Sequence, residues 1–318
     1  MGGASCGFDL RFGPPLTASP PMTGIPWILR SLLFIPGDRG DMIAKAPGSG
    51  ADAIILDLED GVAPETKAEA RRVIARALAN VYSPRQVVFL RVNGVESGLL
   101  EQDLDEVFRP GIAGVCLPKC HSAEQVLSVD ARLRVLEERH ALPPGATRLL
   151  PMIEGARGVL NALQVGDAHA RNWGLAFGAE DFTADIGVAR TREGGEVGYA
   201  RAAVSLAAHA AGIEAVDGIF ADFRDTSGLY ADALVARGMG YTGKMVIHPA
   251  QIATVHAAFA PTQAEVDQAR RIAMAFADAQ DRGLGVVVVD GAMVDRPVVL
   301  RAQRVLALAA RADPSAPR

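Results

Sequence analysis

Short apolar segments recur along the chain with helix-like segments between them, and this alternation restricts the fold more than any other feature. Several of the apolar segments are hydrophobic on consecutive residues, which is typical of strands buried on both faces of a parallel sheet. Helical patterns at Glu65–Ala79, Ala123–Glu138 and Tyr199–Ala211 lie between them. The predicted strands are Leu32–Ile35, Ala53–Leu58, Val87–Val92, Ile112–Leu117, Leu149–Ile153, Gly174–Phe177, Val216–Phe220 and Lys244–Ile247.

Strands that alternate with helices in this number and spacing predict an α/β fold, closed as a (β/α)8 TIM barrel. An open doubly wound sheet is the alternative, because counting strands does not show whether the sheet closes. No GxGxxG motif opens a helix after the first strand, so a dinucleotide-binding fold gains no support. The 318 residues are 49% hydrophobic but only 5% aromatic, which suits one large aliphatic core.

The chain continues past the eighth predicted strand with an addition that a barrel does not need. We expect this extension to contain a helix at Thr262–Asp281, a strand at Gly285–Asp290, a turn at Gly291–Pro297 and a last helix at Pro297–Ala310. This helix–strand–helix tail either caps its own barrel as a lid or reaches a neighbouring subunit. The expected parts are a disordered leader (1–24), a catalytic barrel (25–260) and a lid or oligomerisation extension (261–318).

Composition excludes several classes of protein. With 32 basic and 37 acidic residues the net charge is −5, which argues against nucleic acid as the main partner. No apolar run approaches the roughly 20 residues of a membrane span, and the leader lacks the apolar core of a secretory signal. The three cysteines, Cys6, Cys116 and Cys120, are too few for a disulfide framework. We therefore expect a cytoplasmic protein without a membrane or nucleic-acid partner.

Polar side chains follow the predicted strands at the end where barrel enzymes have their active sites. Packing several carboxylates together is costly unless a cation neutralises them or they keep protons. Oxygen ligands without a histidine or cysteine cluster suit Mg²⁺. Glu154 and Asp181 form the natural pair, although both could instead cap the helices that follow. The carboxylates at strand ends are Asp57, Glu59, Asp60, Glu154, Glu180, Asp181 and Asp222.

Arg91 lies between Leu90 and Val92 in an apolar strand, so its guanidinium needs an anionic partner. One hypothesis is a bidentate contact with a substrate carboxylate or enolate oxygen. The other is a structural ion pair with Asp57 or Glu59, the supporting carboxylates of the preceding strand end.

Four further residues each have two possible roles. The basic residues Arg30 and Lys45 near the first strand could support the site by meeting phosphate, or form a solvated face. His248, before Pro249, is either bonded to the backbone or a general base. Asp295, two residues before Pro297, is either a helix cap or a mobile acid–base group that the tail delivers.

The sequence resembles the citrate lyase β-subunit-like group of the HpcH/HpaI aldolase superfamily, from about Arg30 to the C-terminus. Seven segments in the right order indicate this family more strongly than any one of them. They are Arg30–Arg39 (RSLLFIPGDR), Gly50–Arg71, Phe89–Gly94 (FLRVNG), Leu150–Val159 (LPMIEGARGV), Phe177–Gly187, Gly243–Ile252 and Gly291–Pro297 (GAMVDRP).

The resemblance implies a barrel that cleaves or forms a carbon–carbon bond next to a CoA thioester with Mg²⁺. Glu154 and Asp181 match the metal-binding residues, and Arg91 matches the arginine that holds the keto-acid or enolate oxygen. Asp295 matches the catalytic aspartate that malyl-CoA and citramalyl-CoA lyases place over the neighbouring subunit's active site. A homo-oligomer, a trimer or hexamer, is therefore implied.

Other substrate contacts follow from the same resemblance. Phe34 and Lys45 match positions that contact the CoA thioester, and Ile247 with His248 match another substrate-contacting segment. Two departures weaken the CoA contacts: Phe34 stands where some relatives have tyrosine, and Asp41 stands where some have a second lysine.

The activity implied is a retro-Claisen cleavage of malyl-CoA or citramalyl-CoA to acetyl-CoA and glyoxylate or pyruvate, by an oxo-acid-lyase. One alternative is a citryl-CoA lyase that releases oxaloacetate. Another is a pyruvate-type class II aldolase, which needs no CoA. A non-enzymatic alternative is a subunit that works only inside a carrier-protein complex.

Overall fold

Eight parallel strands pair in sequence order and close on themselves, since β1 pairs with β2 on one side and with β8 on the other. The structure is a computed structural model that describes residues 27, 29–80 and 87–312, so the expected leader (1–24) lies outside the described residues. Closure confirms the TIM barrel and excludes the open sheet. The strands are β1 (Ser31–Pro36), β2 (Ala53–Asp57), β3 (Val87–Arg91), β4 (Gly114–Leu117), β5 (Arg148–Ile153), β6 (Gly174–Phe177), β7 (Glu214–Asp217) and β8 (Gly243–Val246).

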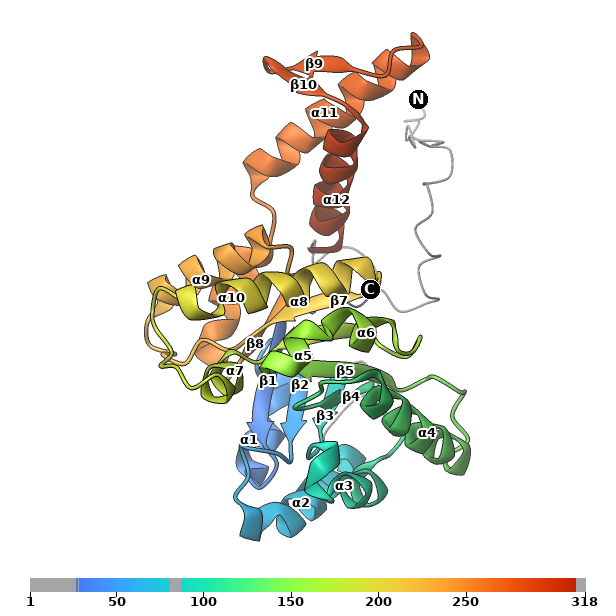
Figure 1. Ribbon diagram of the computed structural model, residues 1–318. Helices are drawn as coiled ribbons and strands as arrows, with labels where there is room; N and C mark the ends of the chain where they lie inside the picture. Colours follow the sequence, from blue (N-terminus) through green and yellow to red (C-terminus); the bar gives the residue numbers. More distant parts are fainter. Residues whose placement is uncertain (1–26, 28, 81–86, 313–318) are drawn as a thin grey trace, which may run out of the picture.

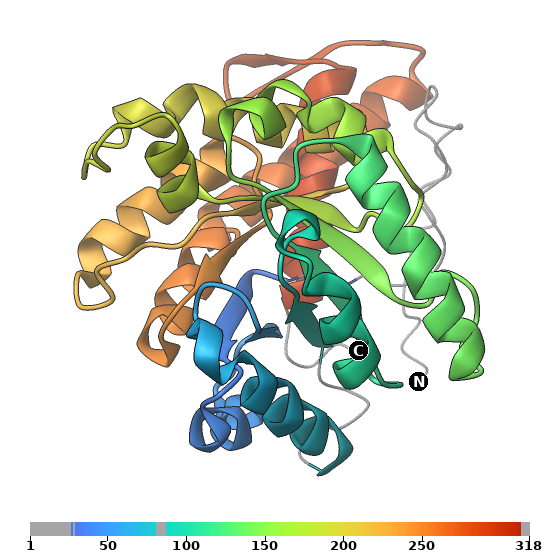
Figure 2. The same ribbon diagram turned by 60° about the horizontal axis from the view of Figure 1, so that its bottom comes forward.

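Helices surround the strands on the outside of the barrel (Figure 2). The α-helices of the barrel are α1 (Gly40–Lys45), α2 (Lys67–Asn80), α3 (Leu100–Val107), α4 (Ala123–Arg139), α5 (Ala156–Leu160), α6 (Ala162–Asp167), α7 (Ala179–Asp185), α8 (Gly198–Ala210), α9 (Thr226–Gly238) and α10 (Ile252–Phe259). Short 3₁₀ turns are η1 (Ala46–Gly48), η2 (Pro64–Thr66), η3 (Val95–Ser97), η4 (Gly195–Val197) and η5 (Pro249–Gln251). No helix of the described residues is long and apolar enough to cross a membrane.

Consecutive apolar residues in the strands serve two separate cores. Leu33 and its outward-facing counterparts pack under the helices, whereas Leu32 belongs to a cluster inside the barrel. Trp27, Phe89 and Trp173 join that inner cluster, with ring centroids 5.6–6.1 Å apart. The double burial explains why these strands show no polar–apolar alternation in the sequence.

The seventh strand ends earlier than predicted, at Asp217 rather than at Phe220. Gly218 sits so close to β6 that a Cβ atom there would lie 2.8 Å from the Phe177 carbonyl oxygen. The chain leaves the sheet at this glycine, so Ile219 lines the mouth of the barrel and Phe220 packs against the outer core instead of extending the strand.

A buried ion network joins β7 and β8 to the helices outside them. Asp217, 1% exposed, accepts hydrogen bonds from Arg201 of α8 (2.7 Å) and from Lys244 of β8 (2.5 Å). Lys244, also 1% exposed, donates a second bond to Asp232 of α9 at 2.7 Å. Each buried charge therefore has an opposite partner, which offsets the cost of taking it out of water.

The C-terminal extension corrects the prediction, because it is a helix–hairpin–helix unit. It consists of α11 (Gln263–Asp281), β9 (Val287–Val289), β10 (Ala292–Val294) and α12 (Arg296–Ala312). The predicted turn at Gly291–Pro297 contains the strand β10, paired antiparallel with β9, and the first residues of α12. Asp290 and Gly291 have φ values of 52° and 80°, so the tight turn lies at this Asp-Gly pair, a hairpin signal present in the sequence.

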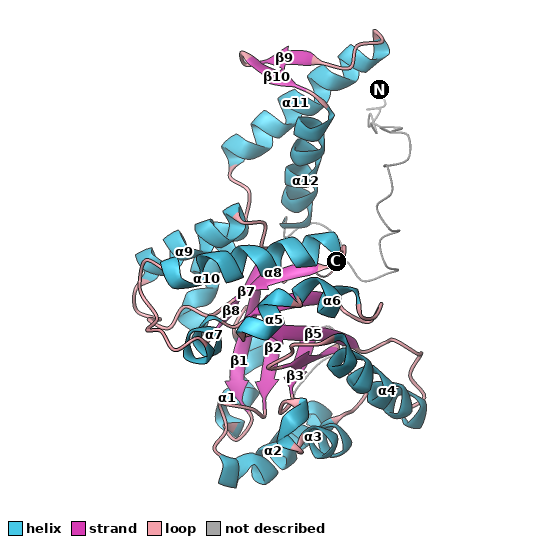
Figure 3. Ribbon diagram, viewed as in Figure 1, coloured by secondary structure: helices cyan, strands magenta, loops and turns pink. Residues whose placement is uncertain are grey.

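The extension projects away from the barrel. In Figures 1 and 3 it rises above the barrel, whereas the arrowheads of β1 and β2 point down. Its own small core consists of Phe276, Val294 and Val299. The carboxyl ends of the strands are therefore not covered by the extension of the same chain.

We expect Lys244→Met to lower the free energy of unfolding by about 3 kcal/mol, because the buried Asp217 and its neighbour Asp232 must then share the single positive charge of Arg201. Urea unfolding followed by circular dichroism measures this change. The exposed Lys45→Met variant is the control, with an expected change within about 0.5 kcal/mol. Equal stabilities of the two variants would contradict the role assigned to the network.

Candidate active site

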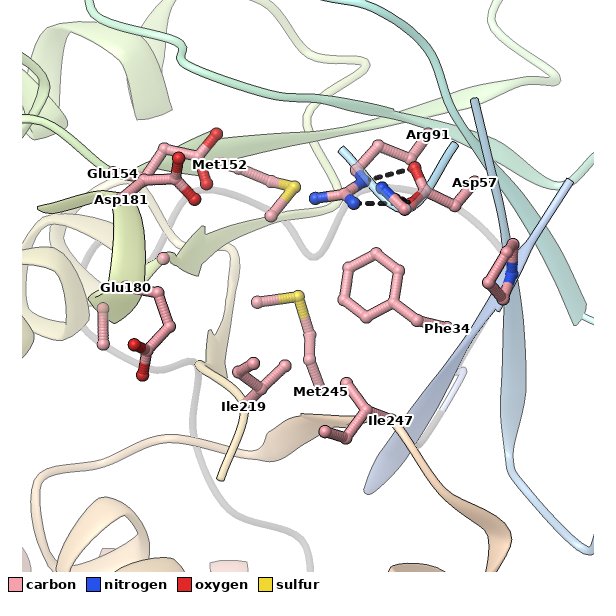
Figure 4. Close-up of a pocket in the computed structure, with 14 residues that line it drawn as sticks. Phe34, Asp57, Arg91, Met152, Glu154, Glu180, Asp181, Ile219, Met245 and Ile247 are labelled. Carbon is pink, nitrogen blue, oxygen red and sulfur yellow. Dashed lines mark hydrogen bonds and ion pairs between the residues drawn. The ribbon is translucent and has the colours of Figure 1, made fainter. Parts of the chain in front are cut away.

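A cavity of about 230 Å³ opens at the carboxyl ends of the barrel strands (Figure 4). Its charged lining consists of four carboxylates and one guanidinium, from Asp57, Glu154, Glu180, Asp181 and Arg91. The structure thus brings together residues from the ends of β2, β3 and β5 and from α7. Convergence of strand ends on one cavity is the arrangement expected of a barrel active site.

Glu154 follows β5 and is 4% exposed. Its Oε1 accepts a hydrogen bond from the backbone N–H of Lys119 at 2.6 Å, and the described residues supply no hydrogen bond to its Oε2. The absent Cβ of Gly178 makes room for this carboxylate, since a side chain there would collide with it. Burial, followed by the negative charge of Asp181, raises the pKa of Glu154 to about 8.

Asp181 lies in the first turn of α7, beside Glu154 (Figure 4). The capping alternative is not found for either residue. Gly178 is the N-cap of α7 without a side-chain bond, and at the start of α5 the Ala156 N–H donates to Asp185 at 2.7 Å. Within the described part of the chain the Asp181 carboxylate has no hydrogen bond or ion pair.

These two carboxylates fit a hard divalent cation. They lie side by side, Glu154 buried and Asp181 half-buried, and no cation of the described residues is bonded to either, so a bound ion would offset their repulsion. Among the described residues, no group of three or more His, Cys, Asp or Glu side chains is positioned to hold a metal ion, so the protein would supply only these two ligands. Water and substrate oxygens would complete the coordination, as is usual for Mg²⁺.

Arg91 ends β3 and is held by carboxylates of the preceding strand end. Its Nε and Nη2 donate to Asp57 at 2.6 Å each, and Nη1 lies 3.1 Å from Glu59 Oε2. The structural ion pair considered in the sequence is therefore present. It leaves N–H groups on both terminal nitrogens unused by Asp57, and the guanidinium faces the cavity above the Phe34 ring, 4.6 Å from its centroid.

Both of the supporting carboxylates expected beside Arg91 are thus in place. Burial opposes the charge on Arg91, but its bond to Asp57 and the charges of Asp57 and Glu59 raise its pKa, so the guanidinium stays protonated. Asp57 also accepts a hydrogen bond from the Gly61 N–H at 2.9 Å. The arginine is consequently rigid before any ligand arrives.

Lys119 is a site residue that the sequence did not indicate. It connects Glu154, after β5, with Glu59 and Asp60, after β2. Its backbone has a left-handed φ of 52°, which aims the N–H at Glu154. Its ammonium bonds Glu59 and, at 3.0 Å, Asp60. The sequence signal for a site residue here is a charged side chain that follows Pro118 at a strand end. The left-handed backbone of Lys119 is not predictable, because a lysine rarely adopts this conformation.

Apolar residues form the rest of the cavity wall. Phe34 and Ile247 line it as expected from the sequence. Met152, Ile219 and Met245 also line it and had not been predicted. The two methionines are each 2% exposed and belong to the inner core, so the cavity floor is continuous with the barrel interior.

Other expected contacts lie outside the cavity lining. His248 accepts a hydrogen bond from the Ala250 N–H at 3.1 Å and stacks on Phe223, which matches the backbone-bonded alternative. Lys45 is exposed in the last turn of α1. Asp222 accepts from the Arg224 N–H at 3.1 Å on an exposed loop.

Two more expected residues are not brought to the cavity. Arg30 directly precedes β1 and pairs with Asp52 at 2.9 Å, so it lies at the amino end of the barrel, at the opposite end of its strand from the cavity. Asp295 lies on the extension, where its Oδ1 accepts from the Val298 N–H at 3.3 Å in the first turn of α12. Its capping interpretation is therefore met within this chain.

Comparison with known proteins gives consistent matches. The HpcH/HpaI aldolase/citrate lyase family profile matches residues 30–249. Citrate lyase subunit beta of Leuconostoc mesenteroides subsp. cremoris is 37% identical over 280 residues, covering 88% of this chain and 93% of that protein. The mitochondrial citramalyl-CoA lyase of Homo sapiens is 34% identical over 302 residues, covering 88% and 85%.

Solved structures from Mycobacterium tuberculosis share the fold. The protein CitE in complex with magnesium, acetoacetate and coenzyme A is 31% identical, with a TM-score of 0.73 over 89% of this chain and 98% of that chain. A CitE complex with magnesium and pyruvate is 29% identical (TM-score 0.65; 88% and 98% covered). A citrate lyase beta subunit with oxaloacetate and magnesium is 31% identical (TM-score 0.63; 74% and 98% covered).

We expect Glu154→Gln to stabilise the metal-free protein increasingly as pH rises. The pKa of Glu154 is about 8 in the folded protein against 4.5 in the unfolded chain, so the folded state retains the proton between these values. The free energy of unfolding of the unsubstituted protein therefore falls through this range, by on the order of 1–3 kcal/mol. The glutamine lacks this ionisation but keeps an oxygen for the Lys119 N–H.

Urea unfolding in EDTA at pH 5, 6, 7 and 8 measures the difference between the two proteins. Glu180→Gln is the matched control, since it removes an exposed carboxylate from the same cavity. A stability difference for Glu154→Gln that stays constant with pH, or equals that of the control at every pH, would contradict the prediction.

We expect Lys119→Gly to be more stable than Lys119→Ala by about 1 kcal/mol, because the left-handed backbone penalises a Cβ atom. Both variants lose the ammonium, so their difference reports the backbone alone. Thermal and urea unfolding of the two variants measure it. The reverse order, which is usual within helices and strands, would show that this conformation is not maintained.

Proposed function

The chain belongs to the HpcH/HpaI aldolase/citrate lyase family, and from this premise we propose that it is a Mg²⁺-dependent carbon–carbon lyase of the oxo-acid-lyase type. Its substrate would be a 3-hydroxyacyl-CoA such as malyl-CoA or citramalyl-CoA. The products would be acetyl-CoA and glyoxylate or pyruvate. The observation that carries the proposal is the pair of adjacent, cation-free carboxylates of Glu154 and Asp181 at the cavity.

Glu154 and Asp181 would hold the magnesium ion, with substrate oxygens and water as its other ligands. The bound ion would supply Lewis-acid chemistry toward the hydroxyl and carboxylate oxygens of the substrate. Lys119 holds the Glu154 carboxylate through its N–H, so this ligand is oriented in advance.

Cleavage transfers the hydroxyl proton to solvent water and breaks the bond between the second and third carbons of the acyl chain. The keto acid leaves, and the bonding electrons pass to the thioester as an enolate. Arg91, fixed by Asp57, donates its remaining N–H groups to the oxygens on which negative charge develops. Removal of such a donor typically costs about 3 kcal/mol of transition-state stabilisation.

CoA would extend from the cavity along its rim. Phe34 and Ile247 line the cavity and are proposed to contact the thioester end. Lys45 and His248 lie outside the lining and are proposed to contact more distant parts of CoA. Support for these contacts comes from the family relationship and from the positions of the four residues, with Phe34 in β1, Lys45 in α1 after it, and Ile247 and His248 directly after β8.

Asp295 is proposed to protonate the enolate carbon in the cavity of a neighbouring subunit. The extension projects away from its own barrel and exposes Met274, Val288 and Met293, which are 66–69% exposed. Such side chains favour burial against another copy of the chain. We therefore propose a homo-oligomer, a trimer or hexamer, in which residues 261–318 act as a lid that excludes water.

A citryl-CoA lyase is the second candidate, favoured by the 37% identity to a citrate lyase subunit beta. A release assay on the purified chain tests both candidates, with malyl-, citramalyl- and citryl-CoA as substrates and with MgCl₂ or EDTA. Release of a keto acid with MgCl₂ only is expected. No release from any thioester would overturn the lyase proposal and favour a carrier-dependent subunit or a CoA-independent aldolase.

We expect Asp295→Asn to lower kcat by about 100-fold or more, because the enolate loses its proton donor. Mg²⁺ and CoA binding, measured by calorimetry, should stay unchanged. Asp290→Asn is the matched control on the same extension, where the side chain pairs with Arg271 and should not affect kcat.

A mixing experiment tests whether the site is shared between subunits. Arg91→Met and Asp295→Asn are each expected to be inactive alone. After co-expression, a mixed oligomer contains some cavities with an intact Arg91 and an intact Asp295 from the neighbour, so activity should return in part. Absence of any recovery, despite mixed oligomers detected by mass spectrometry, would oppose the shared site.

A further inference from the structure

We propose that Lys67 is a positioning residue that directs Arg91 into the cavity, although the Lys67 side chain lies outside the cavity lining. Lys67 is the first residue of α2, behind the end of β2. This inference rests on the proposed lyase function, because it concerns the arginine that faces the substrate in Figure 4. A donor aimed at developing charge is effective only if its direction is set before the ligand arrives.

The Lys67 ammonium is bound by three neutral oxygens. Its Nζ donates to the carbonyl oxygens of Leu58 and Glu59 and to the Oδ1 of Asn93, at 2.7 Å each. An ammonium has three N–H donors, one for each of these oxygens. Within the described part of the chain, no carboxylate forms an ion pair with Lys67. The three acceptors therefore fix the position of the ammonium, and the ammonium holds the three acceptors together.

These three oxygens belong to the two strand ends that carry Arg91 and one of its carboxylate partners. Leu58 and Glu59 follow β2, whereas Asn93 follows β3, two residues after Arg91. The Leu58 N–H donates to the Arg91 carbonyl oxygen at 2.9 Å. Glu59 Oε2 lies 3.1 Å from Arg91 Nη1. By holding the Glu59 carbonyl, Lys67 thus fixes the backbone from which this carboxylate reaches the guanidinium.

The third acceptor, Asn93, is oriented by a buried carboxylate. Its backbone N–H and its Nδ2 donate to Asp103 Oδ2, at 2.8 and 2.6 Å, and Arg71 donates to the other oxygen of Asp103 at 3.0 Å. Asp103 is fully buried. Since the Asn93 Nδ2 is also bonded to the Leu58 carbonyl at 3.0 Å, its Oδ1 is the atom left to accept from Lys67. The cation site is therefore rigid on the β3 side as well.

Helix stability does not explain a lysine at this position. The dipole of α2 disfavours a positive charge in its first turn, where Lys67 lies. The oxygens of the two strand ends compensate for this cost. Without the ammonium, the segment after β2 can shift and carry Glu59 away from Arg91, while Asp57 still holds one edge of the guanidinium. The expected result is an Arg91 that is misdirected rather than lost.

The first experiment uses Lys67→Met in the full-length protein. We expect kcat to fall about tenfold or more for the thioester that the unsubstituted protein cleaves fastest, because the Arg91 donors are misaligned. In MgCl₂, the affinity for pyruvate, measured by calorimetry, should fall about threefold or more. The Mg²⁺ affinity of the ligand-free protein should change by less than about twofold, since Glu154 and Asp181 lie at other strand ends.

This pattern separates positioning from a structural role. A structural tie would lower the free energy of unfolding but leave kcat and pyruvate affinity of the folded protein unchanged, and that outcome would overturn the inference. Arg72→Met is the matched control, because it removes a positive charge from the same helix and its side chain is 65% exposed. None of the three quantities should change in the control.

The second experiment restores the cation without the covalent side chain. Lys67→Ala lacks the part of the side chain that propylammonium replaces atom for atom. We expect propylammonium chloride to raise kcat of this variant about threefold or more, whereas tetramethylammonium chloride, which has no N–H donor, should not at equal ionic strength. An equal response to both salts would oppose the role of the three oxygens.

Lys67→Arg keeps the positive charge and provides a test if the other two variants do not fold. A planar guanidinium cannot aim three N–H groups at the three oxygens around one nitrogen. We expect this variant to fold and to show a kcat and a pyruvate affinity that are each about threefold lower or more. A folded Lys67→Arg variant with both quantities unchanged would overturn the inference.

Failure of the inference is distinguishable from failure of the lyase proposal. Equal kcat and equal pyruvate affinity of the unsubstituted and Lys67→Met proteins would refute the role of Lys67 and retain the lyase. No cleavage of any thioester by the unsubstituted protein, with pyruvate affinity still lowered by Lys67→Met, would refute the lyase and support the positioning of Arg91 by Lys67.

Discussion

The juxtaposition of two carboxylates, Glu154 and Asp181, is the interaction on which the site depends. Burial, followed by the negative charge of Asp181, disfavours the ionisation of Glu154 and raises its pKa. A fold tolerates this cost only where the surrounding structure holds the groups in place. The closed barrel does so by bringing the end of β5 and the start of α7 together and by leaving space at Gly178.

Two other clusters of buried charge in the described part of the chain are balanced, which sets this pair apart. Beneath α8 and α9, the buried Asp217 has both Arg201 and Lys244 as partners. At the rim, Arg91 is matched by Asp57 and Glu59. Compensated networks stabilise the scaffold and orient side chains, whereas the uncompensated pair retains affinity for an external cation. The same contrast separates structural from functional acidic residues at a barrel rim.

Much of the fold was predictable because the buried strands carry a strong local signal. The sequence predicts that Asp57, Arg91 and Glu154 lie at strand ends and that Asp181 follows one, and the structure brings all four to one cavity, since a parallel barrel gathers its strand ends on one face. The early end of β7 was missed because it depends on the contact of Gly218 with β6. Likewise, the sequence predicts a turn where β10 lies. The proline at position 297 signals a turn locally, whereas the strand forms through its pairing with β9.

The sequence by itself determined the order of the elements, the hydrophobic identity of both cores and the residue types at the strand ends, because these follow from periodicity and local chemistry. Only the tertiary structure decided which polar residues share the cavity, since side chains far apart in sequence meet through barrel closure. It excluded Arg30 from the site and added Lys119, Met152 and Met245. It also separated Asp295 from the cavity of its own chain, because the path of the extension depends on packing and not on local propensity.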